Sequence, residues 1–97
     1  MKVVDAEQTQ LAALTRLADF HDQRVLEIGC GDGRLTRGLA QQARTIHASD
    51  PDADAIAAAR TALPADLAAR VSFAVAEASE LDVAPCSIDL VFFSWSL

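Results

Sequence analysis

A short apolar segment that breaks into alternating glycines constrains the fold of this chain more than any other feature. The segment reads Val25-Leu-Glu-Ile-Gly-Cys-Gly-Asp-Gly33, and the residues after it have a helical pattern. A strand, a tight glycine turn and the start of a helix form the ligand-binding corner of many α/β proteins. Arg34 stands where a dinucleotide fingerprint has its last glycine. The segment therefore predicts an α/β fold with a ligand at this turn.

Two carboxylates accompany the turn. Glu27 precedes it in the apolar segment, and Asp32 lies within it. Anion sites at helix starts depend on N–H dipoles that no negative charge opposes. A pyrophosphate is therefore disfavoured here. A ligand with a cationic end, such as an ammonium or a sulfonium, is favoured.

The composition excludes several classes of protein. The chain has 97 residues, which is one small domain, and 52% of them are hydrophobic. The net charge is −6 and no basic patch occurs, so these residues give no sign of nucleic-acid binding. No apolar stretch approaches the roughly 18 residues of a membrane span, and no secretory leader is evident. The expected compartment is the cytoplasm.

Hydrophobic periodicity predicts alternating strands and helices. We expect an N-terminal amphipathic helix, 1–22, followed by a ligand-binding domain, 23–97. Within that domain we expect strands at 24–28, 45–49, 71–75 and 88–93, with helices at 33–42 and 52–61. Continuous apolar strands favour a parallel sheet with helices on both faces. Numbering these strands 1 to 4, right-handed crossovers predict the order 3-2-1-4.

Acidic and small residues follow the carboxyl ends of the expected strands, where ligands of such sheets bind. Asp50 is placed to accept both hydroxyls of a ribose, although Asp50 before Pro51, or Asp52, could instead cap a helix. Glu27 needs either a ligand ammonium or N–H groups of the turn that it would orient. Glu77 is a candidate for an adenine amine, or a solvated loop acid.

The cysteines, histidines and clustered acids do not predict a metal site. Cys30 and Cys86 lie far apart in the chain, with no metal-ligand spacing. Cys30 is interpreted as a small filler of the turn. The acids from Asp50 to Asp54 begin a predicted helix, where its dipole favours negative charge.

Four ordered segments resemble the motifs of class I S-adenosylmethionine-dependent methyltransferases: Val25–Gly33, Ala48–Asp50, Val71–Ala78 and Ser87–Leu97. The resemblance covers roughly residues 20–97. It implies a Rossmann-like fold and S-adenosyl-L-methionine as cofactor. It also implies a cofactor site in which the methionine end contacts Glu27 and the turn (Gly29, Cys30, Gly31, Gly33), with Ser94 beside the methionine. In that site the ribose contacts Asp50 beside Pro51. The adenine lies among Ala76, Glu77 and Ala78.

The resemblance further implies methyl transfer by in-line displacement, which depends on positioning and requires no nucleophilic side chain. We therefore predict no catalytic residue. Phe93-Ser94-Trp95-Ser96 differs from the Asn/Asp-Pro-Pro-Tyr motif of amino-group methylases of DNA and some proteins, which favours a small-molecule acceptor. The alternatives are a non-catalytic S-adenosylmethionine-binding or structural module and a nicotinamide-dependent oxidoreductase, which Arg34 and the acids oppose.

The family fold has three further strands, 5–7, after the strand expected at 88–93. The sequence thus predicts the cofactor-binding half of a methyltransferase, truncated before those strands. The strand at 88–93 would then be an uncovered edge, through which the chain could self-associate.

Overall fold

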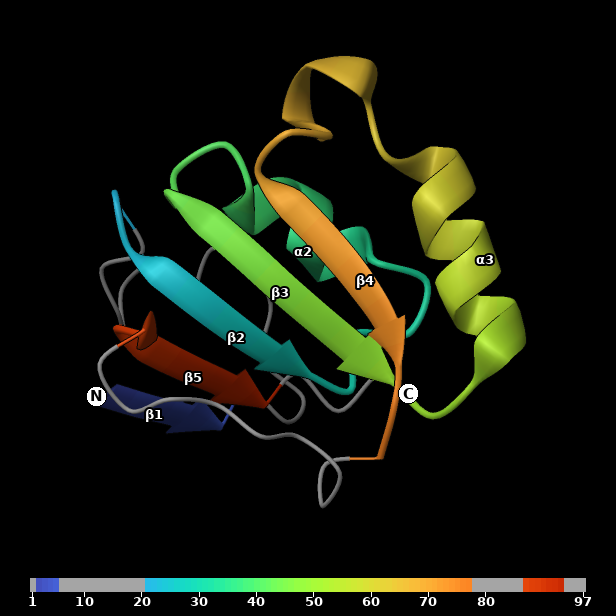
Figure 1. Cartoon of the computed structure of the whole chain (residues 1–97), viewed down its shortest axis with the longest axis horizontal. Helices are drawn as coiled ribbons and strands as arrows, with labels where there is room; N and C mark the ends of the chain where they lie inside the picture. The colour runs from blue at the N-terminus through green and yellow to red at the C-terminus, as the bar shows by residue number, and fades with distance from the viewer. Residues whose placement is uncertain (1, 6–20, 78–86, 94–97) are drawn as a thin grey trace.

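The computed structural model describes residues 2–5, 21–77 and 87–93. All five strands of these residues run parallel in one sheet, in the order β1-β5-β2-β3-β4 (Figure 1). Their bounds are β1 Lys2–Asp5, β2 Arg24–Ile28, β3 Thr45–Asp50, β4 Val71–Val75 and β5 Leu90–Phe93. The expected order 3-2-1-4 is confirmed, because it corresponds to β4-β3-β2-β5.

Two α-helices make the crossovers on either side of β3. Helix α2 is Arg34–Leu39 and α3 is Ala53–Ala62, followed by a short 3₁₀ turn, η1, at Ala65–Leu67. The alanine-rich sequence of α3 has high helix propensity. Buried residues of both helices, such as Leu39 and Ile56, share one core with alternate residues of the strands. Both described helices therefore cover the same face of the sheet, and Figure 1 shows α2 behind it.

The N-terminal strand corrects two expectations. Residues 2–5 form β1 rather than part of a helical segment, and β1 pairs with β5 from Lys2 opposite Leu90 to Asp5 opposite Phe93. The prediction that β5 is an uncovered edge, open to self-association, is therefore wrong, because β1 pairs along that edge. The remainder of the expected helix, 6–20, lies outside the described residues.

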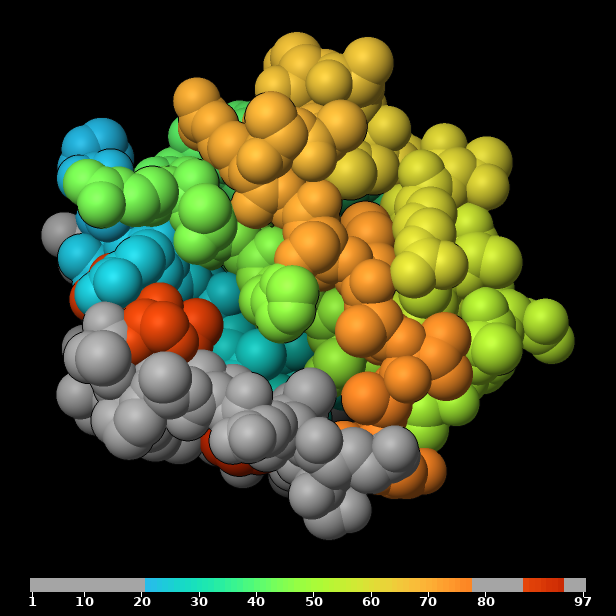
Figure 2. Space-filling view, viewed as in Figure 1, coloured from blue at the N-terminus to red at the C-terminus, as the bar shows by residue number. Residues whose placement is uncertain are grey.

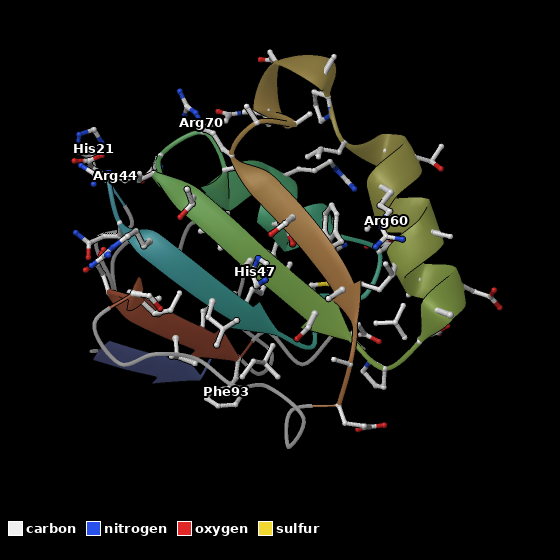
Figure 3. All side chains as sticks on the ribbon, viewed as in Figure 1. His21, Arg44, His47, Arg60, Arg70 and Phe93 are labelled. Atoms are coloured by element: carbon white, nitrogen blue, oxygen red, sulfur yellow. The ribbon has the colours of Figure 1, made fainter. Side chains whose placement is uncertain are left out.

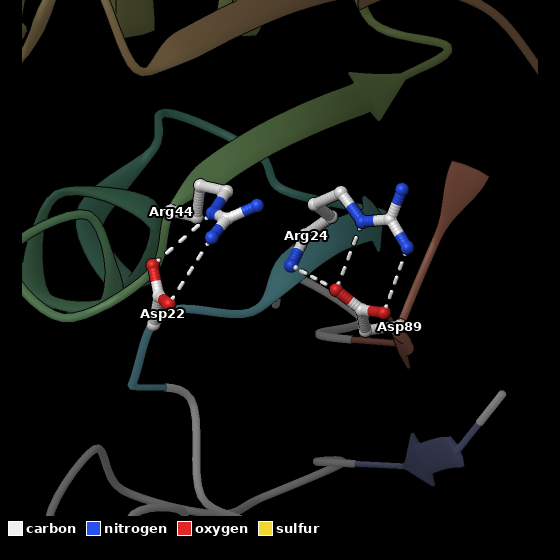
Figure 4. A network of polar contacts seen from close by, with 4 residues as sticks. All are labelled: Asp22, Arg24, Arg44 and Asp89. Carbon is white, nitrogen blue, oxygen red and sulfur yellow. Dashed lines mark hydrogen bonds and ion pairs between the residues drawn. The ribbon is translucent and has the colours of Figure 1, made fainter.

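Two ion pairs fix the amino ends of the central strands (Figure 4). The backbone N and Nε of Arg24 donate to Oδ2 of Asp89 at 2.9 and 3.0 Å, and Nη2 donates to Oδ1 at 3.0 Å. Arg44 Nε donates to Asp22 Oδ1 at 3.1 Å. The hydrogen bonds from Arg24 hold the pKa of Asp89 well below its ordinary value. This pairing fixes β5 against β2 at the end of the sheet opposite the glycine turn.

The second face of the sheet differs between its two halves. Leu26 and Val91, on β2 and β5, are buried, whereas His47 and Ser72, on β3 and β4, are exposed and hydrogen-bonded to each other. Figure 3 shows His47 midway along β3, and Figure 2 shows side chains of β2, β3 and β4 at the surface of this face. No helix among the described residues is long and apolar enough to cross a membrane.

Candidate functional site

The glycine turn follows β2 and crosses the carboxyl end of β3. Gly29, Gly31 and Gly33 have φ of 81°, 58° and 81°, a region that residues with a Cβ rarely adopt. The N–H groups of Gly29 and Cys30 both donate to the carbonyl of Ser49, at 2.8 and 3.0 Å. The alternating glycines are thus required by three left-handed backbone positions.

Most N–H groups of the turn already have acceptors within the chain. Besides the two that donate to Ser49, the Gly33 N–H donates to the Cys30 carbonyl at 3.0 Å, and the Arg34 N–H to Asp32 Oδ1 at 3.2 Å. The Gly31 N–H donates to Asp50 Oδ2 at 2.9 Å. An anion at this turn would therefore compete with the chain's own oxygens.

Asp50 ends β3 and joins the turn to the start of α3. Asp50 is 8% exposed; its Oδ2 accepts from the N–H of Gly31, and its Oδ1 accepts from the N–H of Asp52 at 2.9 Å. The helix cap is Asp52, whose side chain accepts from the N–H groups of Asp54 and Ala55. The interpretation of Asp50 as the cap is therefore wrong, and Asp52 is the residue that satisfies the orphan donors of α3.

Glu27 lies beneath the turn. It is fully buried on β2, between Ala48 of β3 and Phe92 of β5, and its Oε1 accepts a hydrogen bond from the hydroxyl of Thr36 on α2. Its carboxylate is thus enclosed by the chain rather than displayed on the rim of the sheet.

The turn lies in a negative electrostatic field. Cys30 is 4% exposed, and burial, followed by the charges of Glu27 and Asp50, raises the pKa of its thiol to about 12. The thiol is therefore protonated at neutral pH and packs in the core, as expected of a small filler. The same field favours a cationic group on a ligand that lies over the turn.

The segment after β4 returns to the same rim. The N–H of Ala76 donates to the carbonyl of Asp50 at 3.1 Å, which places Ala76 beside the end of β3. Ala76 is partly exposed, and Glu77 and Pro51 are exposed. Ala78 and Ser94 lie outside the described residues. The structure therefore brings together the turn, Asp50 and Ala76. Glu27 does not reach this rim, because it is buried between β2 and α2.

Sequence reasoning did not single out Thr36. It is fully buried in α2 and donates its hydroxyl to Glu27. A carboxylate in an apolar strand indicates that some donor must meet it, but the donor lies nine positions away on another element. Only the packing of α2 on β2 identifies it.

Two other features do not contribute to this rim. A hollow of about 450 Å³ opens near the amino ends of β3 and β4, where Thr45, His47, Arg70 and Ser72 contribute to its wall. It therefore lies at the opposite end of these strands from the glycine turn. Within residues 2–5, 21–77 and 87–93, no group of three or more His, Cys, Asp or Glu side chains could hold a metal ion.

Comparison with known proteins identifies the family. Residues 25–97 match the family model described as a methyltransferase domain. The chain belongs to this family. The match begins in β2 and includes the turn, Asp50 and the segment after β4, so the rim described above belongs to the methyltransferase domain itself.

Individual relatives support the same conclusion. The chain is 41% identical to ribosomal RNA small subunit methyltransferase C of Chromohalobacter salexigens over 66 residues. The aligned region covers 67% of this chain and 20% of that relative. Phosphoethanolamine N-methyltransferase 1 of Haemonchus contortus, solved with phosphoethanolamine and S-adenosylhomocysteine, superimposes with a TM-score of 0.71 and 29% identity. That match covers 84% of this chain and 17% of the other.

An S-adenosylmethionine-dependent methyltransferase of Mesorhizobium loti superimposes with a TM-score of 0.72 and 25% identity, over 86% of this chain and 36% of the other. The methyltransferase domain described here therefore spans about a third or less of the length of these three relatives.

Proposed function

We propose that this methyltransferase domain binds S-adenosyl-L-methionine at the rim formed by the glycine turn, Asp50 and the segment after β4, and serves as the cofactor half of a methyl transfer. The observation that carries the proposal is the Asp50 carboxylate, which lies at the end of β3 and is hydrogen-bonded to the turn at Gly31. Turn and carboxylate thus form one rim, as expected for a ligand with both an amino-acid end and a ribose.

Each part of the rim has a proposed role. The turn (Gly29, Cys30, Gly31, Gly33) approaches the methionine end closely because its glycines have no side chains. Each oxygen of Asp50 accepts one backbone N–H and has a further lone pair for a ribose hydroxyl, with Pro51 adjacent. The adenine lies among Ala76, Glu77 and Ala78, and Ser94 lies by the methionine. Glu27 acts from below through its charge.

When bound, S-adenosyl-L-methionine would supply a sulfonium methyl group for in-line transfer to an acceptor, with the thioether S-adenosylhomocysteine as the leaving group. The contribution of the domain is to hold and orient this group, so we assign no catalytic side chain. A nicotinamide dinucleotide is the less suitable ligand, because the N–H groups that would receive its pyrophosphate donate within the chain.

We favour a small-molecule acceptor. The exposed acids Asp32, Asp52 and Glu77 lie on or beside the rim, and the net charge of the chain is −6, which opposes close approach of a polyanion. Among the relatives, one is named for phosphoethanolamine and one for ribosomal RNA. Competition by short RNA against S-adenosylhomocysteine would argue against a small-molecule acceptor.

Calorimetric titration tests the proposal. The chain is titrated with S-adenosylmethionine, S-adenosylhomocysteine and NADH as the control ligand. Saturable binding of the first two near one site per chain, with none for NADH, is the expected result. Equal binding of NADH would refute the proposed selectivity of the rim for S-adenosyl-L-methionine. Tight binding with no methyl transfer to any acceptor would favour the non-catalytic module.

A further inference from the structure

We propose that Thr36 is a positioning residue that holds the Glu27 carboxylate beneath the glycine turn and thereby sets the preference of the site for ligands with a cationic amino-acid end. The inference rests on the proposed cofactor site and adds a residue that does not touch the ligand.

The first argument is the burial of both partners. Glu27 and Thr36 are each 0% exposed, and the hydroxyl of Thr36 donates to Oε1 of Glu27. On the sheet, Glu27 is flanked by Ala48 and Phe92, which offer no side-chain donor. A buried carboxylate is tolerated only where hydrogen bonds stabilise its charge. The Thr36 hydroxyl is such a bond, and it comes from the helix that follows the turn.

The second argument is that helix propensity does not favour threonine at this buried position of α2. Thr36 lies beside Leu35 and one helical turn before Ala40, whose N–H donates to the Thr36 carbonyl at 2.9 Å. Leucine and alanine have higher helix propensity than threonine. A buried hydroxyl in this helix is therefore explained by its acceptor, Glu27, rather than by the helix.

The third argument is that the charge of Glu27 reaches the turn. The thiol of Cys30, within the turn, has a raised pKa for which burial is the first cause and the charge of Glu27 the second. Asp50 contributes to the same field from the end of β3, and Asp32 from the turn. An ammonium over the turn would experience the same field with the opposite, favourable sign. Displacing the Glu27 carboxylate would weaken that attraction.

The test compares two ligands that share a nucleoside thioether. S-adenosylhomocysteine carries the amino-acid end, and methylthioadenosine lacks it. Thr36→Val keeps the branched shape and removes the hydroxyl, whereas Thr36→Ser keeps the hydroxyl. Thr61→Val is the matched control, because the Thr61 hydroxyl donates to a carbonyl of its own helix, that of Ala57, and the residue is exposed.

We expect Thr36→Val to weaken S-adenosylhomocysteine binding roughly tenfold and methylthioadenosine binding by less than about twofold, the scale of one charged hydrogen bond acting indirectly. Thr36→Ser and Thr61→Val should bind both ligands like the parent chain. Equal losses for the two ligands, or a loss in Thr36→Ser as large as in Thr36→Val, would refute the inference while leaving the cofactor site intact. Failure of the parent chain to bind either ligand would refute the proposed function and, with it, this inference.

Discussion

Replacing Gly33 with alanine should destabilise the chain strongly, and the structure gives the reason. Gly33 has φ of 81° and precedes α2; a Cβ there would lie 3.0 Å from Cβ of Ala59 and 3.5 Å from Cε1 of Phe73. The left-handed backbone costs an L-residue about 1–2 kcal/mol. Overpacking of a filled core costs about 1–3 kcal/mol more. The expected loss is therefore about 2–5 kcal/mol, a large share of the roughly 5–15 kcal/mol that stabilises a domain.

Urea denaturation measures this loss. With a slope of about 1–3 kcal/mol per molar urea, the midpoint should fall by about 2 M at the middle of both ranges, and by at least roughly 0.7 M. A double-mutant cycle separates the contact from the backbone strain. Ala59→Gly removes the Cβ that the new methyl group meets. It should lower the free energy of unfolding by about 1 kcal/mol in the parent chain, but by less, or not at all, in the Gly33→Ala background.

Ala58→Gly is the matched control for this cycle, because Ala58 lies on the same helix and is exposed. Ala58→Gly should lower the free energy of unfolding by about 1 kcal/mol, equally in the parent chain and in Gly33→Ala. The reasoning is refuted if Gly33→Ala costs less than about 1 kcal/mol, or if Ala59→Gly couples to it no more than Ala58→Gly does.

Three further predictions concern single side chains. Asp50→Ala should weaken S-adenosylhomocysteine binding by about 1–3 kcal/mol in calorimetry, the cost of losing charged hydrogen bonds. Arg24 lowers the pKa of Asp89, so the ion pair stabilises the fold above the ordinary pKa of 3.8, and this stabilisation is lost as the pH falls below 3.8. Thermal melting curves of Asp89→Asn should therefore lack this loss of stability in acid. In Cys86→Ser chains, Cys30 should react with a thiol reagent at pH 8 only as fast as the fold opens, since burial raises the pKa of its thiol to about 12.

The order of the main strands could be predicted because its causes are local. Strands β2, β4 and β5 are short, largely apolar segments, and β3 lies between two predicted helices, so right-handed crossovers leave one arrangement. Strand β1 was missed because it has only four residues, and Val3 and Val4 are its sole β-branched signal. Its partner, β5, lies at the other end of the chain, so no local pattern indicates the pairing.

The location of the candidate site could also be predicted, but how deeply each of its residues is buried could not. Strand ends place Glu27 and Asp50 near one rim, yet exposure depends on what packs above a residue. Glu27 points toward α2 and is enclosed by it, whereas Asp50 stays at the rim between two N–H donors. The choice between Asp50 and Asp52 as the cap was likewise open, because both precede the same helix and only the backbone conformation decides between them.

The position of Asp50 explains why one carboxylate can select the ligand in two ways. By accepting from Gly31, it occupies an N–H group that a pyrophosphate would need, and its charge repels that anion. Its oxygens still have lone pairs for a neutral ribose, which donates hydrogen bonds and carries no charge. On the proposed function, the residue that closes the turn to phosphates would also bind the nucleoside, and the enclosed charge of Glu27 would add a preference for a cation at the other end. A nucleoside joined to an amino acid would then suit both residues, whereas the pyrophosphate of a dinucleotide would meet an occupied N–H group and a like charge.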